Sequence, residues 1–247
     1  MSLCKDCVAG VTHEGTPTGK IEIIGGIESY VATPKGDYPK DKVLLYLSDI
    51  FGIPLVNNKL LADDFARNGF KVVLPDILNG DSVPIEVMEA GNFDIGAWFS
   101  NHSREVTRAP IDKVITALKA DGVKEFGALG YCFGARYGFD LALDQQLKVL
   151  AISHPSLLQF PTDFEKYVSS TSTPLLINSC ETDSFFPAEL HEKVDEIFGK
   201  YTPGYKREYF PGCKHGFAVR GDVSIPAVKA GKEGAFKASV DWLAKYW

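Results

Sequence analysis

The chain has 247 residues, of which 45% are hydrophobic, enough to bury a sizeable core and to form a single α/β domain. Its formal charge of −6, from 26 basic and 32 acidic residues, predicts neither a nucleic-acid-binding surface nor an anchor on anionic lipid. No apolar run approaches the roughly 18 residues of a transmembrane helix, and the N-terminus lacks the apolar segment of a signal peptide, so no membrane partner is expected.

The first predicted elements are a hairpin, a buried strand and a helix, in that order. Residues 20–33 hold two β-rich arms around a Gly-Gly turn, which predicts the hairpin. Residues 43–48 form a continuous apolar run, which is typical of a strand buried on both faces. Residues 57–68 carry apolar side chains at helical spacing and end before Gly69, a helix stop signal. Residues 71–74 are predicted as the next strand.

The remaining elements alternate between helices and strands. They are predicted as a helix over 107–120, a strand over 124–129, a helix after that strand, strands over 149–152 and 174–179, a helix over 188–198, a strand over 206–210 and a helix from about 226. Such alternation predicts an α/β fold with a mostly parallel central sheet and helices on both faces. We expect residues 20–247 to form this one domain and residues 1–19 to be an N-terminal extension packed on it.

A short motif follows the strand predicted over 124–129. Residues 130–134 read GYCFG, the pattern of a nucleophile elbow with cysteine at its centre. A strand that feeds directly into a helix must turn sharply, so glycines are needed two residues before and two residues after the nucleophile. The N-terminus of the following helix favours negative charge on the Cys132 sulfur. The motif therefore predicts Cys132 as a nucleophile.

An acid and a histidine follow in chain order. Asp183 comes just after the strand predicted over 174–179, and His215 comes just after the strand predicted over 206–210. Taken singly, Asp183 is equally interpreted as a helix cap or turn residue, and His215 as a loop histidine. Nucleophile, acid and base in this order, each past the carboxyl end of a strand, form the α/β-hydrolase arrangement. We therefore predict His215 as the general base, oriented by Asp183.

The cysteines bear on compartment and on metal binding. There are five, an odd number with one of them apparently catalytic, which favours a reducing compartment over a disulfide scaffold, and we predict a cytoplasmic protein. Cys4 and Cys7 with His13 could form half of a zinc site, but no second Cys/His pair at ligand spacing follows. No GxGxxG motif follows a strand. We expect neither a metal nor another cofactor.

A set of short motifs resembles the dienelactone hydrolase (carboxymethylenebutenolidase) family, in its fungal branch, over about residues 18–246. The motifs are GYCFG at 130–134, ETDSFFP at 181–187, HGF at 215–217, and SDIFG at 48–52 followed by LPD at 74–76. The resemblance implies an α/β-hydrolase fold and a hydrolase of esters or lactones with a cysteine nucleophile.

The resemblance also implies roles for residues after the strand predicted over 43–48. Family members carry a glutamate at the position of Asp49, where the carboxylate is thought to hold the cysteine in its resting state until substrate arrives. Asp49 is one methylene shorter, and the alternative is that it only bonds local backbone. The oxyanion hole is expected from the backbone N–H groups of Ile50 and of Phe133, which directly follows the nucleophile.

Basic and aromatic side chains are the predicted substrate contacts. Dienelactone hydrolases grip a substrate carboxylate with arginines, and Arg220, five residues after His215, is predicted to do so here unless it is a solvated surface charge. Three further arginines have no secure counterpart in the family and are interpreted as surface charges: Arg104, Arg108 and Arg136. Four aromatic residues are predicted to line the pocket unless they are ordinary core residues: Trp98, Phe99, Tyr131 and Phe186. Residues 79–103, irregular and Gly-rich, are expected to cover the site.

These motifs together predict a cofactor-free hydrolase of esters or lactones that forms an acyl-enzyme on Cys132. A thioesterase of the same fold is the nearest alternative. A non-hydrolytic thiol protein, acting as a redox sensor or a ligand carrier, is the alternative from another class. The intact acid and base argue against it, because a sensor needs a thiolate but no oriented base. A small-molecule ester or lactone is the only partner expected, and the sequence leaves both a monomer and a homodimer open.

Overall fold

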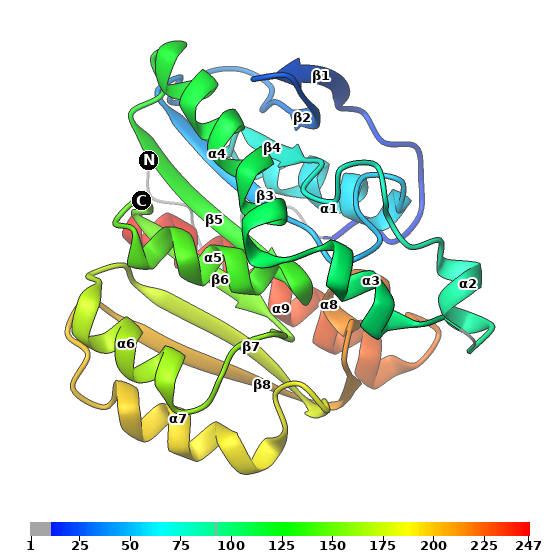
Figure 1. Cartoon of the computed structure of the whole chain (residues 1–247), viewed down its shortest axis with the longest axis vertical. Helices are drawn as coiled ribbons and strands as arrows, with labels where there is room; N and C mark the ends of the chain where they lie inside the picture. The colour runs from blue at the N-terminus through cyan, green and yellow to red at the C-terminus, as the bar shows by residue number, and fades with distance from the viewer. Residues whose placement is uncertain (1–10, 92) are drawn as a thin grey trace.

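A computed structural model describes residues 11–91 and 93–247 of the chain. Within these residues, eight strands form one central sheet (Figure 1). The strands are β1 Lys20–Ile24, β2 Ile27–Ala32, β3 Lys42–Leu47, β4 Val72–Pro75, β5 Glu125–Tyr131, β6 Val149–Ser153, β7 Leu175–Thr182 and β8 Tyr205–Lys214. They lie in the order β1-β2-β4-β3-β5-β6-β7-β8. The hairpin β1–β2 and the pair β2–β4 are antiparallel, and every other neighbouring pair is parallel.

Helices cover both faces of the sheet (Figure 1). They are α1 Val56–Arg67, α2 Ile85–Glu89, α3 Ile95–Asn101, α4 Arg104–Ala120, α5 Phe133–Leu143, α6 Thr162–Ser170, η1 Ala188–Leu190, α7 His191–Phe198, α8 Phe217–Arg220 and α9 Pro226–Tyr246. One hydrophobic core joins the sheet to α4, α5, α6 and α7, and a second joins its other face to α1, α8 and α9. The α/β-hydrolase fold predicted from the sequence is confirmed.

Strand β3 illustrates why these residues form a strand buried on both faces. Val43, Leu45 and Leu47 point into the core beneath α4 and α5, and Leu44 and Tyr46 point into the opposite core. All five side chains are fully buried. Successive side chains of a strand point to opposite faces, so a continuous apolar run is what a strand between two helical layers requires.

The segment before β1 is held on α1 by hydrogen bonds from its backbone N–H groups to two aspartate side chains of that helix. The N–H of Thr12 donates to an Asp64 carboxylate oxygen at 2.6 Å, and the N–H of Thr18 donates to Asp63 at 2.6 Å. Both aspartates are buried. Their carboxylates accept from backbone N–H groups of the segment, which would otherwise lack partners because the segment pairs with no strand. Residues 11–19 therefore pack on the domain. The first ten residues of the predicted extension lie outside the described part of the chain, and the domain boundary stays a prediction.

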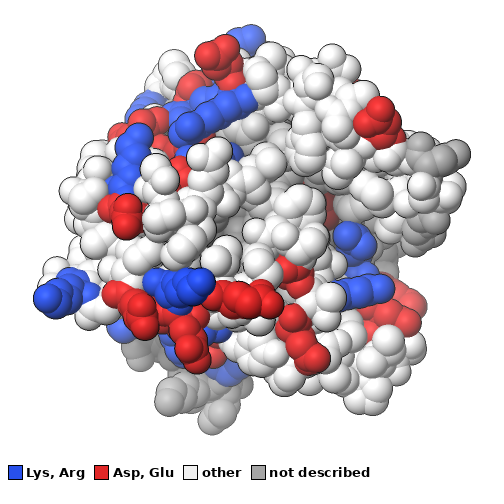
Figure 2. Space-filling view, turned by 60° about the horizontal axis from the view of Figure 1, so that its bottom comes forward, with Lys and Arg blue, Asp and Glu red and all other residues white. Residues whose placement is uncertain are grey.

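The surface mixes the two signs of charge. On the face that Figure 2 shows, basic side chains lie among acidic ones. No described helix is both long and apolar enough to cross a lipid bilayer. The absence of nucleic-acid and membrane partners stays a prediction.

Several short helices differ from the sequence-based expectation. The segment 79–103, predicted as irregular, contains α2 and α3. Helix α6 is not predicted by the apolar pattern, because only Phe164 and Tyr167 of its nine residues are buried. A helix with so few core positions produces a weak periodic signal.

Candidate active site

Cys132 sits in a strained turn between β5 and α5, and its backbone has φ 50° and ψ −113°. Side-chain-bearing residues seldom adopt a positive φ, and such positions persist only where the surrounding structure enforces them. The two glycines of the motif explain how the turn is accommodated. A Cβ on Gly134 would lie 2.1 Å from the carbonyl oxygen of Leu47, and a Cβ on Gly130 would lie 2.7 Å from Cα of Ala135. The close approach of β3, β5 and α5 thus requires both glycines.

The strained residue is held by hydrogen bonds from neighbouring backbone. The N–H of Cys132 donates to the carbonyl of Ser153 at 3.2 Å, and its own carbonyl accepts from the N–H groups of Ala135 and Ser156 at 3.1 Å. Both polar groups of the Cys132 peptide backbone therefore have partners, which helps to hold the strained turn in place.

Asp183 and His215 meet at the carboxyl ends of β7 and β8. Oδ1 of Asp183 accepts from the backbone N–H groups of Phe185 and Phe186 at 2.9 and 3.2 Å, and Oδ2 accepts from Nδ1 of His215 at 2.8 Å. The N–H of His215 also donates to the carbonyl of Thr182 at 2.9 Å. Side chain and backbone together fix the direction of the imidazole, as a base requires.

The electrostatic surroundings of His215 favour its charged form. Burial by itself lowers the pKa of the imidazole, but the hydrogen bond to Asp183 and the neighbouring Cys132 sulfur raise it more, to about 10. The other ring nitrogen, Nε2, is buried and has no hydrogen-bond partner among the described residues. It is therefore free to exchange a proton with the sulfur or with a bound molecule.

A small cavity joins Cys132 and His215. Its volume is about 180 Å³, and it is also lined by Asp49, Ile50, Phe51, Met88, Ile95, Phe99, Ser156, Phe185, Gly216 and Arg220. Ile50 lies in the loop after β3, which ends at Leu47, where the expected oxyanion donor should lie. Phe133 is the first residue of α5, so its N–H has no acceptor within the helix. Their roles as oxyanion donors stay predictions.

Asp49 lines this cavity but is bonded locally. Its Oδ1 accepts from the backbone N–H of Phe51 at 3.2 Å and from the side-chain amide of Asn58 at 3.0 Å. Its Oδ2 is buried without a hydrogen-bond partner among the described residues. Burial raises the pKa of the Asp49 carboxyl, whereas Asn58, Arg220 and Phe51 lower it. The carboxylate thus lies near the site without a hydrogen bond to the Cys132 sulfur.

Arg220 is the arginine that reaches the cavity. Its guanidinium lies 5.1 Å from the centre of the Phe51 ring, a cation–π contact. Gly216, at φ 88°, makes room for it, because a Cβ there would lie 2.7 Å from Cζ of Arg220. The guanidinium forms no ion pair with a carboxylate of the described residues within hydrogen-bonding distance. It is exposed, and can therefore take an anionic partner.

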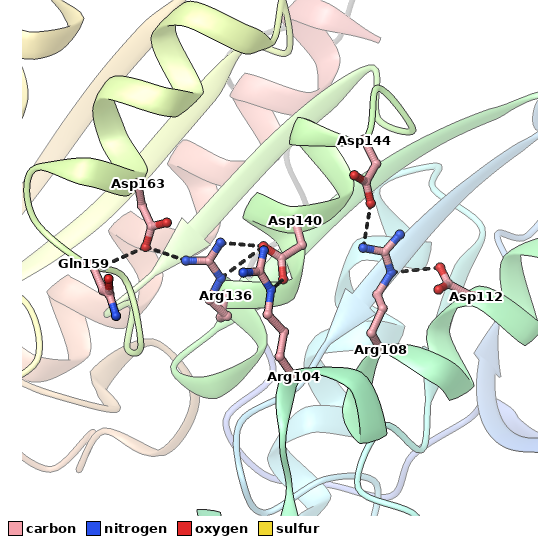
Figure 3. A network of polar contacts seen from close by, with 8 residues as sticks. All are labelled: Arg104, Arg108, Asp112, Arg136, Asp140, Asp144, Gln159 and Asp163. Atoms are coloured by element: carbon pink, nitrogen blue, oxygen red, sulfur yellow. Dashed lines mark hydrogen bonds and ion pairs between the residues drawn. The ribbon is translucent and has the colours of Figure 1, made fainter.

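The other three arginines are engaged elsewhere (Figure 3). Arg104 and Arg136 both pair with the buried Asp140, and Arg136 also pairs with Asp163. Arg108 pairs with Asp112 and Asp144 at 2.8 Å. These ion pairs tie α4, α5 and α6 together behind the elbow. Arg136 is buried rather than a surface charge, because two carboxylates compensate its guanidinium there.

Of the four aromatic residues predicted to line the pocket, Phe99 lines it and the other three lie in the core. Trp98 donates from Nε1 to the carbonyl of Asp81 at 3.0 Å, and Tyr131 stacks on Tyr46 with ring centroids 4.8 Å apart. Phe186 packs on the far side of the acid loop, against α6. Phe185, the chain neighbour of Phe186, also lines the cavity. Phe185 faces the cavity in place of Phe186 because successive side chains point in different directions.

Two residues of the turn after β6 belong to the site and were not expected from the sequence. Ser156 lines the cavity beside Cys132. His154 packs edge-on against His215, with ring centroids 5.0 Å apart, and burial keeps its pKa well below the ordinary histidine value. Its neutral ring supports the base by packing. No local motif marks either residue, since the packing of β6 beside β5 brings them to the nucleophile.

The described residues contain no group of three or more His, Cys, Asp or Glu side chains that could hold a metal ion. Cys4 and Cys7, the half zinc site considered from the sequence, lie outside the described residues. The described cysteines, Cys132, Cys180 and Cys213, are free thiols.

A model of the Dienelactone hydrolase family matches residues 27–247. The chain is 34% identical to Hydrolase pyvD of Aspergillus violaceofuscus, over 97% of this chain and 95% of that protein. It is 32% identical to Dienlactone hydrolase 1 of Gibberella moniliformis, over 98% of this chain and 92% of that protein. A putative dienelactone hydrolase from Klebsiella pneumoniae has a similar structure, with a TM-score of 0.70, 19% identity and coverage of 89% and 93%.

Proposed function

This chain belongs to the dienelactone hydrolase family, and on that premise we propose that it hydrolyses carboxylic esters or lactones through a Cys132–His215–Asp183 triad. One observation carries the proposal. A cysteine in a strained elbow shares a cavity of about 180 Å³ with a histidine whose opposite ring nitrogen is bonded to a buried carboxylate. This is the arrangement of nucleophile, base and orienting acid that acyl transfer needs.

Acylation would begin at the Cys132 sulfur. The thiolate attacks the acyl carbon, a C–S bond forms, and the carbonyl π electrons move to the oxygen. The N–H groups of Ile50 and Phe133 would stabilise that negative charge. Collapse of the intermediate breaks the C–O bond, the leaving oxygen takes the proton from Nε2 of His215, and a thioester remains on Cys132.

Deacylation would use the same groups in reverse. His215 removes a proton from water as the water oxygen attacks the thioester carbon, and collapse breaks the C–S bond and returns the thiolate. Asp183 keeps Nδ1 protonated and Nε2 directed into the cavity in both halves of the cycle. A cavity of this volume suits a small acyl or lactone group.

Initial rates on a matched panel of p-nitrophenyl esters, lactones and acyl-thioesters test the function. Turnover of esters or lactones at a higher kcat/KM than the thioesters supports the proposal. A preference for the thioesters would assign the thioesterase alternative. No turnover of any member by folded protein with a titratable Cys132 thiol would favour the non-hydrolytic thiol protein.

Arg220 is proposed to recognise a carboxylate on the substrate. We expect Arg220→Gln to raise KM for an anionic ester about tenfold, because a charge-assisted hydrogen bond contributes about 1.5–3 kcal/mol and its exposure puts Arg220 at the low end. The change in KM for a neutral ester of the same length should be small. Steady-state kinetics on both substrates measure the effect.

Arg108→Gln is the matched control, since Arg108 is ion-paired away from the cavity. Equal increases of KM for the anionic and the neutral ester in Arg220→Gln would contradict carboxylate recognition.

Asp49 is proposed to disfavour the Cys132 thiolate in the substrate-free protein. The carboxylate lines the same cavity, and a like charge in a buried site raises the pKa of a thiol. We expect Asp49→Asn to lower the apparent pKa of Cys132 and to speed its alkylation without substrate. The rate of iodoacetamide alkylation as a function of pH measures the shift. Asp241→Asn on the exposed side of α9 is the control, and curves for Asp49→Asn that superimpose on wild type would leave Asp49 with a local structural role only.

A further inference from the structure

The side chain of Ser156 hydrogen-bonds the Cys132 sulfur. Its Oγ lies 3.8 Å from Sγ, within hydrogen-bond distance for sulfur, and either atom can be the donor. Sγ is the only side-chain partner of this hydroxyl among the described residues. The sulfur also neighbours His215 and raises the pKa of its imidazole. In the substrate-free arrangement, the nucleophile thus contacts the Ser156 hydroxyl as well as lying beside its base.

The turn after β6 fixes Ser156 in this place. The backbone N–H of Ser156 donates to the carbonyl of Cys132 at 3.1 Å, so backbone and side chain of one residue both bind the nucleophile residue. His154 and Leu157 have φ values of 38° and 62°, which non-glycine residues adopt only when packing enforces them. Ser156 is 1% exposed. A buried hydroxyl held this rigidly loses little entropy when it forms a hydrogen bond.

The other polar side chains near the sulfur are differently occupied. Asp49 accepts from Phe51 and Asn58, and its negative charge opposes that of a thiolate. His215 supplies its proton to the leaving group during turnover. A hydroxyl is neutral, so it can donate to the sulfur at every stage without taking part in proton transfer.

We infer that the hydroxyl of Ser156 donates a hydrogen bond to the Cys132 thiolate and lowers the free energy of the charged nucleophile relative to the thiol. This inference rests on the proposed role of Cys132. A hydrogen bond to an ionised acceptor is about twice as strong as one between neutral groups, so the donor favours S⁻ over S–H. Ser156 therefore acts opposite to Asp49 on the same sulfur.

The bond also changes through the catalytic cycle. When the C–S bond forms, the sulfur loses its negative charge and the hydrogen bond from Ser156 weakens. When water attacks and the C–S bond breaks, the charge returns to sulfur and the bond strengthens. Ser156 thus stabilises the leaving thiolate in deacylation, and its removal should slow the hydrolysis of the acyl-enzyme as well as the formation of the nucleophile.

The experiment measures the pKa of Cys132 from thiolate absorbance at 240 nm and from the pH dependence of iodoacetamide alkylation. Ser156→Ala and Ser156→Gly, which both lack the hydroxyl, should raise the pKa by about one unit and slow alkylation about tenfold at a pH below the pKa. Ser156→Thr, which keeps the hydroxyl, should restore most of the wild-type pKa. Ser179→Ala is the matched control, because the Ser179 hydroxyl is buried and bonds the carbonyl of Glu208 instead.

The pKa of Cys132 in these variants decides whether the Ser156 hydroxyl donates to the thiolate. An unchanged pKa in both hydroxyl-free variants would overturn the inference. A lowered pKa would overturn it too, because the hydroxyl would then accept from the neutral thiol. A separate measurement tests the proposed function. If Cys132→Ala keeps its hydrolytic activity, the proposed nucleophile is wrong, whatever the Ser156 variants do to the pKa of the thiol.

Discussion

Replacing Cys132 with alanine should lower kcat for ester and lactone hydrolysis by at least about 10⁴-fold, the size of effect seen when a triad nucleophile is removed. The reason is geometric. The elbow places the Cys132 side chain at the start of α5, on the cavity that His215 also lines, and alanine offers no nucleophile there. The fold should survive, because alanine removes only a sulfur atom that borders a cavity.

The measurement combines kinetics with chemical labelling. Iodoacetamide should inactivate the wild-type protein with a time course that matches modification of Cys132 in a peptide map. Cys213→Ala is the matched control, since the Cys213 thiol is buried and bonds the carbonyl of Ala227 instead. Full hydrolysis by folded Cys132→Ala, or loss of activity while Cys132 stays unmodified, would show that another residue is the nucleophile.

Removing the base or its orienting acid should lower the rate by about 10²–10⁴-fold. His215→Ala deletes the proton carrier. Asp183→Asn keeps an oxygen that can accept from the N–H groups of Phe185 and Phe186, but it replaces the acceptor of the His215 Nδ1 proton with an amide. The imidazole would then lose both its orientation and the charge that stabilises its protonated form. A decrease of less than about fivefold in either folded variant would mean that another group carries the proton.

Asp183→Asn should also change how the free energy of unfolding depends on pH. The pKa of His215 is raised to about 10 in the folded protein, above the value of about 6.5 for an unperturbed histidine. A raised pKa means that the folded state holds its proton more tightly, so this stabilisation is fully present below about 6.5 and is lost as the pH rises through about 10. Thermal unfolding of wild type and Asp183→Asn across this range should show the difference between them shrinking as the pH rises.

The amino-acid sequence by itself determined the fold and the three candidate catalytic positions. A strand between two helical layers buries side chains on both faces and is therefore a continuous apolar run, which is why β3 was predictable from residues 43–48. The elbow was predictable because its close backbone contacts leave no room for a Cβ at Gly130 or Gly134, so only glycine fits there. Asp183 and His215 were predictable because parallel strands carry their carboxyl ends to one edge of the sheet.

Only the tertiary structure decided which neighbours complete the site. Ser156 is 24 residues from Cys132 and reaches it through the pairing of β5 with β6, a contact that no local pattern encodes. Phe185, rather than the predicted Phe186, lines the cavity, because a shift of one residue along a loop turns a side chain to another side. Composition and spacing specify which elements form. The direction of each side chain follows from how those elements pack.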